Sequence, residues 1–272
     1  MPQPPAYINT DKSLIELETT DSTNNYALKQ VHAGLAHNGI AYFAREQSTG
    51  KGQRGKKWLA AKDSSLLLSI VKDPAPLKLS QQFRLSACIA VSVCNFFNNY
   101  TGGNAQIKWP NDLYWHDRKA GGILIENIIG ATGGDGSQQK KIEHPLWKWS
   151  VIGIGININQ KSFPDELQNP VSLKQITGRD FIPVDLAKEL CFIIDKNYQQ
   201  LVNDGFEAIY SSYLSLLYKK NEIVKLKKGS RVFESIVKTV TPNGKLVVGH
   251  SMEEEFDFGE IEWVIPAAIP EN

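Results

Sequence analysis

Four cations and three glycines lie within TGKGQRGKKW, residues 49–58. From Gly50 onward this segment nearly matches the phosphate-binding P-loop G-x-x-x-x-G-K-[ST], but Lys57 stands where the motif needs a hydroxyl for Mg²⁺. A P-loop also opens a helix, whereas residues 64–71, SSLLLSIV, have the pattern of a buried strand. A glycine-rich basic loop of this kind is instead typical of a lid over a phosphorylated ligand. A solvated loop and a contact to nucleic acid are the alternatives.

Lys108, in QIKWPND (106–112), is a second candidate for binding an anion. Strand alternation places it on the face opposite Ile107 and Trp109. Because the neighbouring GGILIEN (121–127) contains three consecutive aliphatic residues, we expect this part of the sheet to be central and buried on both faces. A buried ammonium needs an anionic partner, and no carboxylate is obviously paired with this one. The alternative to a bound ligand carboxylate or phosphate is an ordinary solvated lysine.

The segment VIGIGININ (151–159) predicts a strand with two unlike faces. One face carries only isoleucines, at positions 152, 154, 156 and 158. The other carries Gly153 and Gly155, followed by Asn157. Glycine weakens a strand interior, so these two need a reason. Either a helix packs closely over them, or they form a flat platform for a ligand that Asn157 can hydrogen-bond.

The polar run DSTNN (21–25) predicts the start of a helix that Asp21 or Ser22 caps and that Gly34 ends. A simple N-cap accounts for these residue types. The same geometry leaves hydroxyl and backbone N–H groups at a helix N-terminus, where they can bind a small polar group.

Composition limits the function further. The chain has 272 residues and a formal net charge of +1, so it has no general attraction to nucleic acid or to anionic membranes. Its three cysteines show no metal-binding or disulfide spacing, and we expect Cys88 and Cys94 to fill the core of a helix. The N-terminus lacks the pattern of a signal peptide, and no apolar run is long enough to span a membrane. We therefore expect a soluble, cytoplasmic protein.

A mixed α+β framework must position these candidates. Up to about residue 220, predicted strands (14–17, 39–47, 64–72, 105–115, 119–127 and 151–159) alternate with predicted helices (22–34, 79–100 with Ser80 as its cap, and two between 184 and 217). Residues 130–148 are expected to form an exposed excursion within the sheet. The remaining chain consists of short strands, with Asn243-Gly244 as a hairpin signal. We expect a catalytic domain at 1–220 and a small SH3-like β-barrel at 221–272.

Four separated motifs together resemble the biotin protein ligases: DSTN (21–24), EQSTGKGQRGKKW (46–58), KWPNDLYWHDRKAGGILIE (108–126) and GIGININ (153–159). The resemblance implies the class II synthetase-like biotin/lipoate ligase fold and a biotin–[acetyl-CoA-carboxylase] ligase. Such enzymes use Mg·ATP to activate biotin as biotinyl-5′-AMP, and then transfer biotin to a lysine of a biotin carboxyl carrier protein. They use no enzyme nucleophile, so catalysis rests on positioning and charge neutralisation.

The resemblance also implies roles for individual residues. Biotin-binding positions match Ser22, Thr23, Asn24, Gln47, Lys51, Gly52, Gln53, Lys108, Gly153 and Gly155. Positions for ATP or the adenylate match Lys51, Arg54, Lys56, Trp58, Lys119 and Asn157. Lys108 and Arg54 are the expected catalytic residues. No protein metal site is expected, because Mg²⁺ enters with ATP.

Two departures from the family pattern matter. Many members carry G-R-G-R-R-G-R, where this chain has Lys51, Gln53 and Lys56, so the role of the neutral Gln53 is open. Repressor members also carry an N-terminal winged-helix domain, whereas the ligase pattern here begins at Asp21, so no DNA binding is expected. A lipoate or octanoate ligase on the same fold and a non-catalytic biotin- or nucleotide-binding protein are the alternatives. The sequence leaves open whether the protein is a monomer or a homodimer, which protein is the acceptor, and in what order the loop closes.

Overall fold

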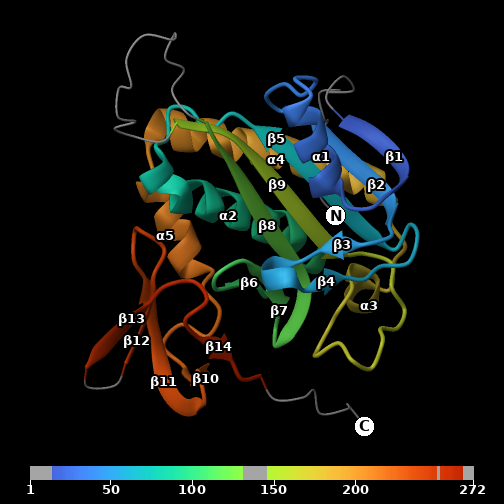
Figure 1. Ribbon diagram of the computed structural model, residues 1–272. Coiled ribbons are helices and arrows are strands. Elements are labelled where there is room, and N and C mark those ends of the chain that lie inside the picture. Colours follow the sequence, from blue (N-terminus) through green and yellow to red (C-terminus); the bar gives the residue numbers. More distant parts are fainter. Residues whose placement is uncertain (1–13, 131–145, 250–251, 266–272) are drawn as a thin grey trace, which may run out of the picture.

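A seven-stranded mixed sheet forms the centre of the protein (Figure 1). The computed structural model describes residues 14–130, 146–249 and 252–265. In spatial order the strands are β1 (Leu14–Thr20), β2 (Ala41–Gln47), β5 (Ser65–Lys72), β9 (Leu146–Asn157), β8 (Arg118–Gly130), β7 (Asp112–Trp115) and β6 (Ala105–Lys108). β1 and β2 are parallel, and every other neighbouring pair is antiparallel. The expected mixed α+β architecture is thus confirmed.

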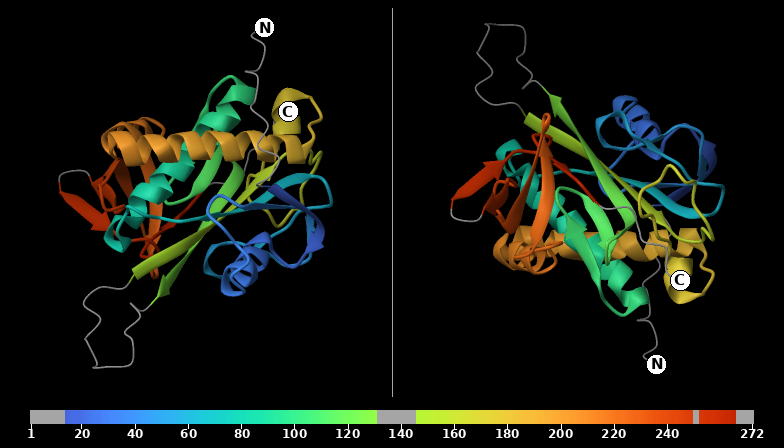
Figure 2. Two further views of the ribbon diagram at one scale, coloured as in Figure 1. Left: turned by 90° about the horizontal axis from the view of Figure 1, so that it is seen from above. Right: turned by 90° about the horizontal axis from the view of Figure 1, so that it is seen from below.

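Helices cover both faces of this sheet. After the N-terminal helix, the described residues form α2 (Gln82–Thr101), α3 (Leu173–Thr177), α4 (Pro183–Asp204) and α5 (Glu207–Ser215). α2 and α4 pack on the face that carries the β9 isoleucines, which are at most 3% exposed. The first helix, α1 (Thr23–His32), packs on the opposite face, beside Tyr42 and Val151 (Figures 1 and 2). The candidate residues at the start of α1 therefore lie on the face that carries Gly153 and Gly155.

Three local expectations need revision. Residues 105–115 form two strands and not one, because a short reversal at 109–111, which contains Pro110, separates β6 from β7. The expected cap Ser80 lies within a 3-10 turn, Leu79–Gln81, and α2 begins at Gln82. Sequence patterning also missed α3, because a helix of about one turn shows no periodicity. Cys88 and Cys94 do fill the core, with no exposed surface.

A second, antiparallel sheet follows α5, and its form is consistent with an SH3-like domain. In spatial order its strands are β13 (Glu253–Phe256), β12 (Leu246–Gly249), β11 (Arg231–Val240), β10 (Ile223–Lys228) and β14 (Glu262–Trp263). Asn243-Gly244 lies in the β11–β12 hairpin as expected, with Gly244 at φ 92°. The expected excursion at 130–148 lies mostly outside the described residues.

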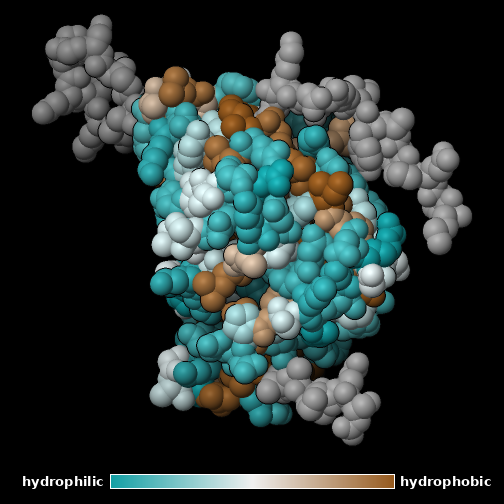
Figure 3. Space-filling model, turned by 90° about the vertical axis from the view of Figure 1, so that its right-hand side faces the viewer, coloured by the Kyte–Doolittle hydropathy of each residue, from teal (hydrophilic) through white to brown (hydrophobic). Residues whose placement is uncertain are grey.

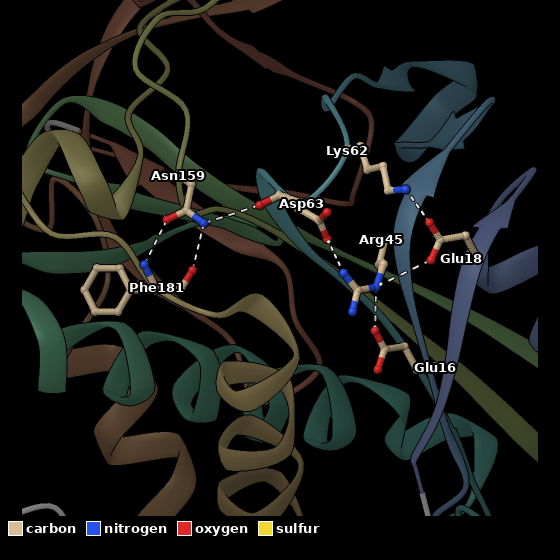
Figure 4. A network of polar contacts seen from close by, with 7 residues as sticks. All are labelled: Glu16, Glu18, Arg45, Lys62, Asp63, Asn159 and Phe181. Atoms are coloured by element: carbon tan, nitrogen blue, oxygen red, sulfur yellow. Dashed lines mark hydrogen bonds and ion pairs between the residues drawn. The ribbon is translucent and has the colours of Figure 1, made fainter.

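A polar network fixes the loop that leads from the glycine-rich segment into β5 (Figure 4). Arg45 on β2 places Nε 2.7 Å from Glu16 Oε1 and Nη1 3.4 Å from Asp63 Oδ1. Asn159 Nδ2 donates to the carbonyls of Asp63 (3.3 Å) and Phe181 (2.8 Å). Each exposed ion pair contributes little stability, but together these contacts hold the end of the loop against β2 and the segment after β9.

The surface is mainly polar on the side shown in Figure 3. Hydrophilic residues cover most of that face, and hydrophobic residues lie in separate groups among them. Over the residues that the structure describes, no helix is both long and apolar enough to cross a membrane.

Candidate active site

One cavity of about 870 Å³ brings the sequence-predicted site residues together. Its wall includes residues from α1, β2, β5, β6, β8 and β9 and from the glycine-rich segment. The predicted residues that line it are Ser22, Thr23, Asn24, Gln47, Lys51, Gly52, Gln53, Arg54, Lys56, Trp58, Lys108, Lys119, Gly153, Gly155 and Asn157. Segments up to 135 positions apart in the chain thus meet at one site, although the role of each side chain stays a prediction.

Thr23, Asn24 and Gln47 line one part of the cavity and belong to a hydrogen-bonded polar cluster that Ser69 and Glu126 complete outside the lining. Gln47 Oε1 accepts from the backbone N–H of Thr23 (2.7 Å) and from its hydroxyl (3.1 Å). Asn24 Nδ2 donates to Glu126 Oε2 (2.8 Å), and the Ser69 hydroxyl donates to Asn24 Oδ1 (2.6 Å). Thr23, Asn24 and Ser69 are at most 4% exposed. These bonds fix the orientation of groups that can offer both donors and acceptors to a neutral polar ring.

Two members of this cluster escaped the sequence analysis. Ser69 lies directly opposite Gly153 in the β5–β9 pairing, and Glu126 is on β8. A serine in a buried strand and a glutamate after three aliphatic residues gave no signal for a site. The capping expectation also changes, because Ser22 occupies the N-cap position but makes no side-chain cap hydrogen bond, while Asp21 Oδ1 accepts from the Ser22 backbone N–H at 2.8 Å.

Close packing of side chains over the strand, one of the two alternatives considered for Gly153 and Gly155, is present, whereas a ligand contact stays a prediction. A Cβ at Gly153 would lie 2.2 Å from Asn24 Oδ1, and a Cβ at Gly155 would lie 2.8 Å from Trp58 Cε2. Side chains of α1 and of the glycine-rich segment therefore lie directly on the strand, so the platform is not bare. Because both glycines also line the cavity, their missing side chains let the cavity extend between these two groups.

The glycine-rich segment is a small hairpin, which confirms that it is not a P-loop. It consists of β3 (Gly50–Lys51), a 3-10 turn at Gln53–Gly55 and β4 (Lys57–Trp58). Lys51 Nζ lies 3.6 Å from Glu126 Oε1. Arg54, at φ 54°, donates from Nη2 to the carbonyl of Gly259 at 2.6 Å. The tip of the hairpin is therefore held against the loop between β13 and β14.

Lys108 is buried in the cavity wall, but its surroundings differ from expectation in two ways. Its strand, β6, is at the end of the sheet, not in the centre. A carboxylate is also present, because the reversal after β6 pairs Lys108 with Asp112 and leaves Nζ 3.9 Å from Asp112 Oδ2. The same carboxylate contacts Lys119, with Oδ1 2.7 Å from Nζ. Two ammonium groups thus share one carboxylate. The three side chains together keep a net positive charge, which a bound anion can neutralise.

The pKa of Lys108 is lowered from its usual value to about 8: burial lowers it most, Asp112 raises it, and the positive charges of Lys119 and Lys56 also lower it. Lys108 is only 8% exposed, so water screens these charges weakly. The side chain is mostly charged at pH 7 and loses its charge as the pH rises through about 8.

Asp112→Asn is expected to narrow the pH range over which the site works. Removing the carboxylate removes the interaction that raises the pKa of Lys108, so this pKa falls below about 8 and the ammonium is lost at lower pH. The alkaline limb of any reaction that needs Lys108⁺ moves toward lower pH, while the rate at pH 6 changes less. The pH profile of the ATP–pyrophosphate exchange that the family resemblance implies measures this.

The matched control is Asp195→Asn, which removes the partner of another buried lysine, Lys72, 3.0 Å away. Its profile is expected to match that of the parent protein. An alkaline limb that stays in place for Asp112→Asn would contradict the assigned coupling between Asp112 and Lys108.

Asn157 is buried and bound mainly by the protein itself. Its Nδ2 lies 3.1 Å from the carbonyl of Val171 and 3.4 Å from that of Lys119. Gln160 donates to its Oδ1 at 3.3 Å. In this structure Asn157 therefore holds the backbone of Lys119 in place, and a direct contact with nucleotide phosphates stays a prediction.

The second sheet closes part of the cavity, which no sequence signal indicated. Phe258, Ile261 and Trp263 line it. Trp109 Nε1 donates to the carbonyl of Gly244 (2.9 Å), and Trp263 Nε1 donates to the carbonyl of Trp109 (3.1 Å). The β6–β7 reversal is thereby tied to both the β11–β12 hairpin and β14.

Comparisons with known proteins agree with this geometry. The model of the biotin/lipoate A/B protein ligase family matches residues 16–139. The bifunctional ligase/repressor BirA of Escherichia coli is 28% identical over 265 residues, which cover 91% of this chain and 75% of that protein. The Bacillus spizizenii protein of the same name is 30% identical over 178 residues, and the match spans 64% of this chain and half the length of that relative.

The fold also matches a solved structure. The biotin protein ligase of Aquifex aeolicus, solved in complex with biotin and ATP, has a TM-score of 0.74 to this chain at 24% identity. The likeness covers 94% of this chain and 100% of that one. It includes most of the residues described above, so the two chains share their overall fold.

Proposed function

We propose that this chain is an ATP-dependent biotin protein ligase of the biotin/lipoate A/B protein ligase family, whose model matches residues 16–139. The observation that carries the proposal is one cavity with unlike parts: the neutral hydroxyl and amide groups of Thr23, Asn24 and Gln47, and the buried ammonium of Lys108 beside a second lysine. Biotin has a neutral ureido ring and a carboxylate tail, so its two ends need these two environments. Relatives named as biotin–[acetyl-CoA-carboxylase] ligases support the same reaction.

The reaction has two steps. In the first, a carboxylate oxygen of biotin attacks the α-phosphorus of Mg·ATP, the new O–P bond forms, and the bond to pyrophosphate breaks. In the second, the neutral amine of an acceptor lysine attacks the carbonyl carbon of biotinyl-5′-AMP. An amide forms, AMP leaves, and the amine loses a proton. Neither step needs an enzyme nucleophile, so the protein acts by holding the reactants and neutralising charge.

The cations of the cavity supply this neutralisation. We propose that Lys108 contacts both the biotin carboxylate and the α-phosphate, whose mutual repulsion otherwise opposes attack. Lys119, held near it by Asp112, is placed for the nucleotide phosphates. Lys51, Arg54 and Lys56 on the hairpin are the proposed contacts of the phosphate groups; in this structure Arg54 donates to the carbonyl of Gly259 instead. Mg²⁺ enters with ATP as part of the substrate.

The acceptor we propose is the biotin carboxyl carrier protein domain of a biotin-dependent carboxylase. We also propose that residues 1–220 form the catalytic domain and residues 221–272 the small barrel domain. A reducing compartment such as the cytoplasm suits the free thiols of Cys88 and Cys94, whose pKa values burial raises to about 12. DNA binding is not part of the proposal.

The direct test is the mass of a purified carrier domain before and after incubation with this protein, ATP, Mg²⁺ and biotin. We expect a gain of one biotinyl group that needs all four components and that disappears when the acceptor lysine is changed to Arg. Lipoate in place of biotin is expected to give no gain. A gain with lipoate alone would favour the lipoate ligase alternative, and tight biotin binding without any adenylate would favour a binding protein.

A further inference from the structure

The ammonium of Lys108 lies in a box built partly from the second sheet. Its Nζ is 5.0 Å from the centre of the Tyr114 ring and 5.3 Å from the centre of the Trp263 ring. Asp112 Oδ2 occupies a third side at 3.9 Å, and the cavity provides the open side. Both rings are within the range at which an aromatic face attracts a cation. Tyr114 comes from β7, next to Lys108, whereas Trp263 comes from β14.

Trp263 is held firmly in this place. Its Nε1–H donates to the carbonyl of Trp109, the residue after Lys108, and its ring lies 5.7 Å from that of Tyr218. In the pairing of β14 with β10, Trp263 lies opposite the fully buried Leu226. The indole therefore has two separable parts: an N–H group that anchors the backbone, and a ring face that is turned toward the ammonium.

We propose that Trp263 is a positioning residue for Lys108: its ring face, together with Tyr114, restricts the ammonium to the direction of the cavity. This proposal rests on the proposed function of the site. A lysine has four rotatable side-chain bonds, so an ammonium that is free to turn away spends less time at the reacting groups. The second sheet would thus take part in the adenylation step itself, through one side chain, and not only in closing the cavity.

Three variants separate the ring face from the N–H group. Trp263→Leu removes both, whereas Trp263→Phe keeps an aromatic face and loses only the hydrogen bond to Trp109. Trp149→Leu is the matched control, because Trp149 is also half-buried but packs beside Val151 on the α1 face, away from the cavity lining. For each variant, kcat and KM for ATP are measured in biotin-dependent ATP–pyrophosphate exchange.

We expect Trp263→Leu to lower kcat about tenfold with little change in KM, the size of a desolvated cation–π contact. Trp263→Phe is expected to recover most of this loss, and Trp149→Leu to behave as the parent protein. Equal losses for Leu and Phe would show that only the N–H anchor matters and would overturn the proposal, as would full activity of Trp263→Leu. If Trp263→Leu fails to fold, Trp263→Met fills the space without a ring and takes its place.

A second readout does not depend on ligase activity. Acetic anhydride at limiting concentration labels accessible amines, and mass spectrometry of peptides reports the labelling of Lys108 against that of exposed lysines. We expect labelling of Lys108 to rise several-fold in Trp263→Leu and to stay low in Trp263→Phe and Trp149→Leu. Unchanged labelling of Lys108 in Trp263→Leu would contradict the proposed restriction of its ammonium by the Trp263 ring. If the parent protein shows no exchange at all, the proposed function fails, but the labelling result still decides the role of Trp263.

Discussion

Lys108→Met is expected to reduce biotin-dependent ATP–pyrophosphate exchange by about 10²–10³-fold, the usual cost of removing one charge-stabilising group from an enclosed active site. Methionine keeps most of the apolar stem, so the packing against Tyr114 and Trp263 is largely preserved while the charge is lost. Lys108 is 8% exposed and has a single carboxylate nearby, which Lys119 shares.

Lys72→Met is the control for this experiment. Lys72 is another buried lysine, 4% exposed and paired with Asp195, but it does not line the cavity. Its loss is expected to lower the thermal midpoint without lowering exchange per folded molecule. Equal exchange rates for Lys108→Met and the parent protein would remove Lys108 from the mechanism, whereas a similar loss in both variants would indicate a general effect of removing buried lysines.

Gly153→Ala is expected to weaken biotin binding by about 10- to 100-fold, measured by calorimetry. A Cβ would lie 2.2 Å from Asn24 Oδ1, which is impossible, so the Asn24 side chain must move. That movement breaks its bonds to Glu126 (2.8 Å), to the carbonyl of Leu124 (3.2 Å) and from Ser69 (2.6 Å). Without these bonds Asn24 is no longer held in the cavity wall, and losing one or two hydrogen bonds to biotin, at about 0.5–1.5 kcal/mol each, gives an effect of this size.

A double-mutant cycle tests the reason. Asn24→Ala alone is expected to weaken biotin binding by a similar factor, because the same polar group is lost. In that background Gly153→Ala should cost little more, since no side chain remains for the new methyl group to displace. Additive losses in the double variant would show that Gly153 matters through the strand itself, or through direct contact with the ligand, and would contradict the assigned role of Asn24.

The sequence identified most of the residues that line the site, but not the groups that surround and orient them. Lys108, the glycines of β9 and the start of α1 were identified because short motifs mark them, and all line one cavity. The electrostatic partner of Lys108 was missed although Asp112 is only four residues away. The sequence pattern did not reveal that the chain reverses tightly at 109–111 and so pairs Lys108 with Asp112 across two strands. The central position expected for the strand of Lys108 was wrong. The aliphatic run on which it was based belongs to β8, whereas β6 is at the end of the sheet.

The sequence by itself determined which faces are buried and which segments are special. The isoleucine alternation of β9, the hairpin signal at Asn243-Gly244 and the misfit of Lys57 to a P-loop are all properties of a few neighbouring residues. Only the tertiary structure decided which distant segments meet. Trp263 donates a hydrogen bond to the carbonyl of Trp109, 154 positions earlier in the chain. Arg54 donates one to the carbonyl of Gly259, 205 positions later. Such contacts depend on how the sheets pack, and no local pattern records that packing, so the aromatic box around Lys108 became visible only in the folded chain.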